Sequence, residues 1–193
     1  MSITLTTSIE KLIKDRGNHT VGYFSSIVEP RQIDGGAKCK VDIDNFELVE
    51  LYFEQDDQET PYIKPLTDNT KKGYIVDSSE VLHYEALETK LGFFNGKGTM
   101  ANVYVQEPGV TFKTNNFVAG SDGTPEKGMY AKWVVGKSGS APSPEANGHF
   151  EIVKTKPADK NNVFIVWGTT EDMTEELLGL DTIELMIPQV DMA

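Results

Sequence analysis

The sequence predicts a mainly β protein, an antiparallel sandwich or small barrel with one or two short helices. Apolar and polar residues alternate in many short runs, turn-forming residues separate these runs, and helical periodicity is confined to two short segments. The chain has 193 residues, of which 38% are hydrophobic, which is enough for a buried core. We therefore expect residues 18–193 to form a single β-rich domain, with residues 121–128 as the place for any subdivision.

The clearer helical pattern lies in residues 1–17. Thr7 and Glu10 have the spacing of a capping box, and Gly17 provides a stop. Apolar side chains recur there at helical spacing: Ile9, Leu12 and Ile13. A helix of about nine residues does not persist alone in water. Its apolar stripe must therefore dock, either on its own domain or on another chain, and we treat it as a candidate docking arm whose three apolar residues bind the partner.

A second short helix is predicted over residues 171–178, because Thr170 is a suitable N-cap and Gly179 a suitable stop. The remaining periodic segments alternate as strands do. Strands are predicted over residues 21–28, 37–43, 46–53, 73–76, 80–84, 93–94, 100–106, 110–117, 129–135, 149–153, 163–167 and 182–187.

Two of these strands carry more specific expectations. Residues 37–43 alternate with Ala37 and Cys39 on one face and lysines on the other, which indicates a half-buried strand. Residues 46–53 have apolar groups on both faces and should be central. Asn95 and Gly96 are a strong hairpin signal, so we expect residues 93–94 and 100–106 to pair with each other.

Residues 136–148 are rich in glycine, serine and proline. This composition is typical of a mobile surface loop, or of an arm that becomes ordered on a partner. In the second case Pro142 and Pro144 would contact that partner.

The charge balance limits the partners. Lys and Arg total 18 against 30 Asp and Glu, a net charge of −12. Such a chain repels the phosphate backbone, so no direct nucleic-acid partner is expected. No run approaches the roughly 18 apolar residues that span a bilayer, and the first residues do not resemble a secretory signal. We therefore expect no membrane partner and synthesis in the cytoplasm.

Candidate catalytic groups are scattered. The histidines lie far apart in the sequence: His19, His83 and His149. No Gly-x-Ser-x-Gly elbow accompanies the serines, and Cys39 alternates into an apolar face, where a buried inert thiol is expected. We therefore predict a protein that is not an enzyme, with no catalytic residue and no cofactor.

One acidic segment invites a calcium interpretation. It contains Asp42, Asp44, Asn45 and Glu47, but Phe46 occupies the fifth ligand position of a calcium loop and Glu47 the position of the required glycine. Alternation along a strand also disperses the carboxylates. The sequence predicts a turn and a solvated face here and no metal site.

Four segments follow one another in an order typical of one group of viral proteins. They are Ile-Asp-Gly-Gly-Ala-Lys-Cys-Lys-Val over 33–41, Lys-Gly-Tyr-Ile-Val over 72–76, Phe-Phe-Asn-Gly-Lys-Gly over 93–98, and residues 103–112 with their Pro-Gly turn. In this respect residues 33–118 resemble the small capsid decoration, or cement, proteins of tailed bacteriophages.

This resemblance implies a non-enzymatic virion structural protein that binds the major capsid protein, with self-association as a second kind of contact. The protein would be made in the host cytoplasm and would lie on the outer surface of the capsid, where a charge of −12 faces away from packaged DNA. Two alternatives remain open: a tail or baseplate component, and a carbohydrate-binding β-sandwich in which Trp133 or Trp167 stacks on a sugar.

Overall fold

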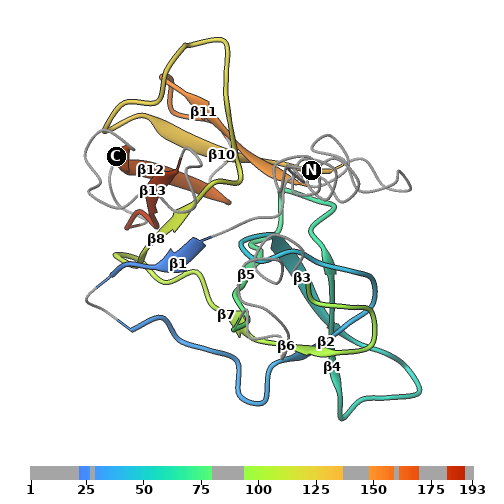
Figure 1. The fold of residues 1–193 in the computed structure, drawn as a ribbon. Coiled ribbons are helices and arrows are strands. Elements are labelled where there is room, and N and C mark those ends of the chain that lie inside the picture. The colour runs from blue at the N-terminus through green and yellow to red at the C-terminus, as the bar shows by residue number, and fades with distance from the viewer. Residues whose placement is uncertain are drawn as a thin grey trace, which may run out of the picture.

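The computed structural model describes residues 22–26, 29–79, 94–136, 148–158, 161–169 and 182–189. Every regular element in these ranges is a β-strand, and the strands form two sheets (Figure 1). The mainly β prediction is confirmed. The helices predicted within residues 1–17 and over 171–178, and the strand predicted over 80–84, lie outside the described residues.

The first sheet has seven strands and comes mostly from the second half of the chain. In spatial order its strands are β1 (Gly22–Phe24), β8 (Thr111–Thr114), β13 (Ile183–Met186), β12 (Val163–Thr169), β10 (Tyr130–Val134), β11 (His149–Val153) and β9 (Phe117–Ala119). Neighbours are antiparallel except β11 and β9, which are parallel. One face of this sheet is buried because side chains alternate, as in β10, where Ala131 and Trp133 point inward.

The second sheet has six strands and closes almost into a barrel. Its order is β6 (Met100–Ala101), β2 (Ala37–Cys39), β4 (Pro61–Pro65), β3 (Leu48–Phe53), β5 (Tyr74–Val76) and β7 (Val103–Tyr104). The two outermost strands, β6 and β7, are separated in sequence only by Asn102, so the chain itself joins the two edges. We call this sheet the barrel. Its strands lie in the sequence between β1 and β8 of the first sheet, and Figure 1 shows it at the lower right.

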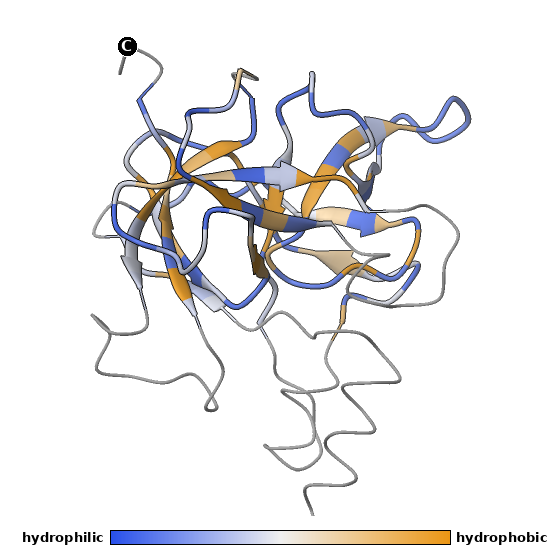
Figure 2. Ribbon diagram, turned by 90° about the horizontal axis from the view of Figure 1, so that it is seen from above, coloured by the Kyte–Doolittle hydropathy of each residue, from blue (hydrophilic) through white to orange (hydrophobic). Residues whose placement is uncertain are grey.

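Two apolar cores hold the strands together. The smaller fills the barrel and includes Cys39, Val49 and Val76. The larger combines the buried face of the seven-stranded sheet with barrel residues such as Leu48 and Ile75. Strands β3 and β5 therefore contribute to both cores, which confirms that residues 46–53 contain a central strand. Figure 2 shows the corresponding hydrophobic stretches on the strands and hydrophilic ones on the loops.

An amide cluster joins the barrel to the seven-stranded sheet. Asn162 is buried and has a positive φ of 55°, a conformation that Asn tolerates better than most residues. Its Oδ1 accepts hydrogen bonds from the backbone N–H of Gly73 at 2.9 Å and from Nε2 of Gln106 at 3.0 Å. Its Nδ2 donates to the carbonyl of Lys71 at 2.7 Å. One side chain thus fixes the loop between β4 and β5 against the start of β12.

The hairpin predicted at Asn95 and Gly96 is wrong in its pairing. Among the described residues, the pairing is instead with the segment 37–43: Asn95 forms a bridge with Ile43, and Met100 and Ala101 of β6 lie opposite Lys38 and Ala37 of β2. The cause is the buried side chain of Asn95, whose Nδ2 donates to the carbonyl of Ile43 at 3.2 Å and to Oδ1 of Asn45 at 3.1 Å. These hydrogen bonds hold Asn95 against the barrel residues Ile43 and Asn45.

Three other differences concern strand limits and connections. Strand β2 ends at Cys39, and Val41, expected on its buried face, is 43% exposed. Strands β4 and β9 were not predicted. Residues 121–128, named as the place for any subdivision, connect β9 to β10 within one sheet.

Candidate interaction surface

A row of side chains crosses four neighbouring strands on the outside of the barrel. Met100 on β6 is opposite Lys38 on β2, Lys38 is opposite Tyr62 on β4, and Tyr62 is opposite Tyr52 on β3. These side chains point away from the barrel core because successive side chains of a strand alternate between its two faces. Ala37 and Cys39, the neighbours of Lys38, belong to the barrel core, so Lys38 lies on the outer face. We call these four residues the barrel row.

Several contacts hold the side chain of Tyr62 in the barrel row. It is 9% exposed, and its hydroxyl donates a 2.8 Å hydrogen bond to Oδ2 of Asp57. The same bond lowers the pKa of Asp57 and raises the pKa of Tyr62. The ammonium groups of Lys38 and Lys40 lie 5.9 and 5.6 Å from the centre of its ring, within the range of cation–π attraction. Lys40 is also paired with Glu54.

Tyr52 continues the same arrangement. Its ring centre lies 6.0 Å from that of Tyr62, and the ammonium group of Lys64 lies 5.5 Å from it. Lys64 also approaches Glu50 at 3.6 Å. Burial raises the pKa of Glu50, but hydrogen bonds from Thr67 and the nearby lysines outweigh it, so the net pKa is lowered. This carboxylate stays charged and helps to hold the lysine in place.

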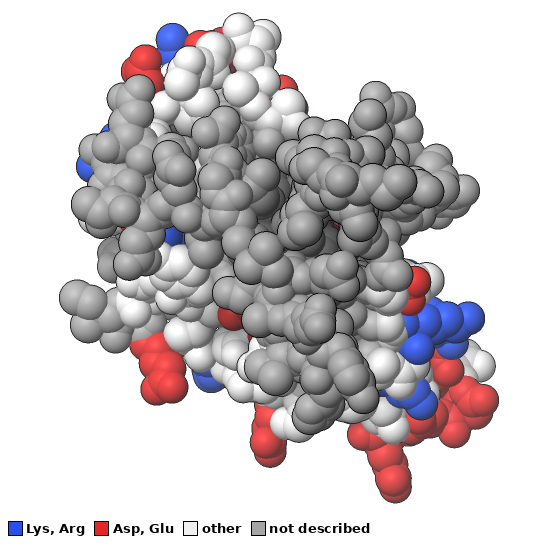
Figure 3. All heavy atoms as spheres, viewed as in Figure 1, with Lys and Arg blue, Asp and Glu red and all other residues white. Residues whose placement is uncertain are grey.

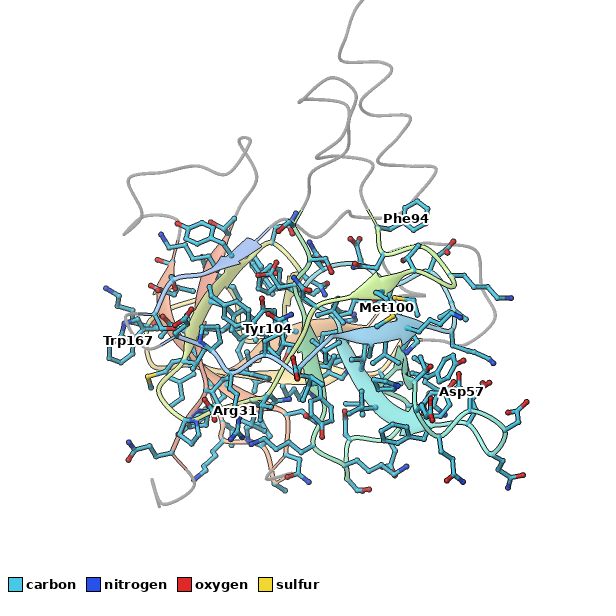
Figure 4. The ribbon with its side chains drawn as sticks, turned by 90° about the horizontal axis from the view of Figure 1, so that it is seen from below. Arg31, Asp57, Phe94, Met100, Tyr104 and Trp167 are labelled. Carbon is cyan, nitrogen blue, oxygen red and sulfur yellow. The ribbon has the colours of Figure 1, made fainter. Side chains whose placement is uncertain are left out.

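Large apolar side chains are exposed on the barrel as well. Met100 is 53% and Phe53 56% exposed. Figure 3 shows Lys and Arg side chains gathered on the barrel side of the molecule, with Asp and Glu beside them. In Figure 4, Met100 and Asp57 lie on one side, whereas Trp167 lies at the opposite end. Exposed apolar groups next to ordered charges are typical of a surface that contacts another macromolecule.

The acidic segment that invited a calcium interpretation serves the turns. Oδ1 of Asp42 accepts the N–H of Lys97 at 2.7 Å, and Oδ1 of Asp44 accepts that of Asn45 at 3.1 Å. Within the described residues no group of three or more His, Cys, Asp or Glu side chains is placed to hold a metal ion. The carboxylates of Asp42 and Asp44 thus hold the backbone of these turns.

The burial expected for Cys39 is confirmed. Its thiol is 2% exposed, and burial raises its pKa to about 11, so it stays protonated at neutral pH. A protonated, enclosed thiol is a poor nucleophile.

The partner-binding residues predicted from the sequence are Ile9, Leu12, Ile13, Pro142 and Pro144. All five lie outside the described residues, so their proposed contacts remain predictions. The sequence analysis missed the barrel row. Alternation around Lys38 indicates its direction, but only the strand register brings it beside Tyr62 and Met100.

In the part of the chain that the structure describes, no helix has the length and apolar character needed to cross a membrane.

Within the described ranges the protein is all-β, and the barrel row lies among exposed apolar side chains and ion-paired lysines on the outside of the barrel. The chain belongs to the YonC prophage protein family, whose model matches residues 15–172. It is similar to the SPbeta prophage-derived uncharacterized protein YonC of Bacillus subtilis strain 168, with 30% identity over 186 residues, 93% of this chain and 99% of that protein. No solved structure matches it. The phage origin expected from the sequence is therefore confirmed.

Proposed function

We propose that this chain is a non-enzymatic structural component of a phage particle, which binds the outer surface of the capsid lattice and stabilises it. Membership of a prophage protein family is the observation that carries this proposal. Such a role needs a folded domain and a contact surface but no catalytic centre.

The barrel row supports the proposal as the surface that contacts the major capsid protein. Its residues project from paired strands, and hydrogen bonds, ion pairs and ring contacts hold their neighbours before any partner arrives. A surface that is already ordered loses little conformational entropy on binding. Met100 adds exposed apolar area that a partner would bury.

Net charge supports the outer rather than the inner side of the capsid. A chain of charge −12 would be repelled by packaged DNA, whose phosphates attract basic proteins. On a lattice of identical subunits, a repeated contact of modest affinity also suffices to cover the surface, and self-association of neighbouring copies would add to it through multivalency.

Co-sedimentation tests the proposal directly. The purified full chain is mixed with capsids that lack it, and the pelleted protein is quantified over a range of concentrations. We expect saturation at a fixed ratio to the major capsid protein. If the folded protein stays in the supernatant, a capsid role is wrong, and the tail and baseplate become the place to search.

A pair of variants tests the contact surface. Met100→Glu places a charge in the barrel row, whereas Val118→Glu makes the same change on β9 of the other sheet; the two side chains are 53% and 47% exposed. Burial of a new carboxylate in an interface is costly, so we expect Met100→Glu to weaken binding at least tenfold and Val118→Glu to leave it unchanged. Equal binding of both variants would show that the barrel row is not the contact.

A further inference from the structure

An exposed tryptophan lies on the seven-stranded sheet, away from the barrel row. Trp167 on β12 is 53% exposed, and Figure 4 shows it at the end of the molecule opposite the barrel. It is the extra residue of a β-bulge, because Val166 is opposite Leu185 and Gly168 is opposite Glu184 in the register of β12 and β13. A bulge bends its strand and redirects a side chain. The bulge therefore displays the indole to solvent.

The carboxylate of Glu184 lies beside this bulge. Glu184 points out of the sheet, because its neighbours Ile183 and Leu185 belong to the larger core. Adjacent strands are about 4.8 Å apart, so the carboxylate is within reach of a small ligand that lies on the indole. Gly168 leaves it uncovered, since a Cβ atom at this position would lie only 3.2 Å from Oε2.

Ser25 fixes the position of this carboxylate. The hydroxyl of Ser25 donates a 2.5 Å hydrogen bond to Oε1 of Glu184, and it lies 3.0 Å from the hydroxyl oxygen of Thr111. Within the described part of the chain, no group forms a hydrogen bond with Oε2. That oxygen is therefore an acceptor for a ligand hydroxyl group.

The same row of side chains continues across the sheet without net charge. Lys113 on β8 is opposite Glu184, and Tyr23 on β1 is opposite Lys113. The ammonium group of Lys113 lies 5.2 Å from the centre of the tyrosine ring. One acidic and one basic side chain balance each other here, in a chain whose total charge is −12. The surface therefore suits a neutral ligand with hydroxyl groups better than an ion.

Trp167 is separated from the other exposed apolar side chains. Among the described residues, the remaining large ones lie on or beside the barrel strands or on β9 at the far edge of the sheet: Val41, Phe53, Met100 and Val118. A protein interface buries a contiguous apolar centre, which a single indole does not provide. A pyranose ring needs less, because one C–H face covers one aromatic ring while its hydroxyl groups meet polar side chains.

We propose that Trp167 and Glu184 form a binding site for a neutral saccharide. One face of a pyranose ring stacks on the indole, and a ring hydroxyl donates a hydrogen bond to the carboxylate that Ser25 holds in place. The inference goes beyond the proposed particle role and does not depend on it, since this site and the barrel row lie on different sheets.

Ligand-observed NMR with the full chain tests the proposal. The neutral probes are the methyl glycosides of glucose, galactose, mannose and N-acetylglucosamine, and glucuronate is the charged probe. Saturation-transfer signals are measured over a range of probe concentrations. We expect saturable binding of at least one neutral probe, with the strongest transfer to its ring C–H protons. Absence of saturable binding by every neutral probe, or preferential binding of glucuronate, would overturn the proposal.

Two variants and one control locate the site. Trp167→Ala removes the stacking surface and Glu184→Ala removes the acceptor, whereas Phe53→Ala truncates an aromatic residue of the barrel that is similarly exposed, 56% against 53%. Each variant is first checked for an unchanged circular dichroism spectrum. We expect a loss of affinity of about tenfold or more for Trp167→Ala, about fivefold for Glu184→Ala, and none for the control.

Equal affinity of Trp167→Ala and Phe53→Ala for the sugar would overturn the assignment, and unchanged affinity of Glu184→Ala would exclude the carboxylate from the site. The same variants are also pelleted with capsids. If Trp167→Ala weakens pelleting while no sugar binds the wild type, the indole contacts protein and the saccharide proposal is wrong.

Discussion

Glu47 makes the stability of this protein depend on pH in an unusual direction. Its side chain is 4% exposed, next to the turn that leads into β3. Burial, followed by the nearby charge of Asp44, raises its pKa from 4.5 to about 8, while a hydrogen bond from the backbone N–H of Asp44 partly opposes the rise. The folded protein therefore holds a proton on Glu47 at neutral pH that the unfolded chain has released.

The sign and size follow from proton linkage. Because the folded state binds more protons than the unfolded state between pH 4.5 and 8, this contribution to the free energy of unfolding is complete below pH 4.5 and is lost as pH rises to 8. The full shift corresponds to about 5 kcal/mol, of which about 3.5 kcal/mol is lost between pH 5 and pH 8.

The substitution Glu47→Gln isolates this contribution, because the amide has the same size and does not titrate. Urea denaturation of both proteins, followed by tryptophan fluorescence at pH 5, 6, 7 and 8, gives the free energies of unfolding. The wild type should lose about 3.5 kcal/mol relative to the variant across this range. Parallel pH profiles would refute the reasoning, because they would mean that Glu47 is ionised in the folded state.

Three further substitutions or reactions test other parts of the structure. Asn162→Ala places alanine at a φ of 55° and removes the hydrogen-bond partner of Lys71 and Gly73 on one loop and of Gln106 on another, so urea denaturation should show a loss of about 3–5 kcal/mol. A loss below about 1 kcal/mol would mean that the amide cluster does not join the two sheets. Gly148→Ala would place a Cβ atom 2.1 Å from the indole of Trp133, so the melting temperature should fall by several degrees and the emission should shift; unchanged values would contradict this packing. Cys39 should react with a disulfide reagent at pH 8 only as fast as the protein unfolds, and immediate reaction of the folded protein would show that the thiol is not enclosed.

The strands could be predicted from the sequence because their signals are local. In β10, β11 and β12, inward and outward side chains alternate, and the predicted ranges contain or nearly match the observed ones. The central position of β3 could also be inferred, since its sequence has apolar groups on both faces. In the structure it supplies Leu48 to one core and Val49 to the other.

Long-range pairing could not be predicted. Barrel closure depends on β6 pairing with β2, some sixty residues earlier, and on Asn95 bonding to Ile43 rather than to its own hairpin. The barrel row exists only because strand register aligns side chains from four strands, which no single segment encodes. The same limit applies to the loop between β4 and β5, where Asn69 meets β10 only in the folded chain.

Quantitative mass spectrometry of purified phage particles tests the central claim most directly. The particles are prepared from a lysogen that carries this gene, banded by density, and compared with particles from a strain in which the gene is deleted. We predict that the protein bands with intact particles in a fixed, repeated ratio to the major capsid protein, and that particles lacking it lose integrity at lower temperature. If the protein is absent from the banded particles while abundant in the lysate, it is not a structural component of the virion.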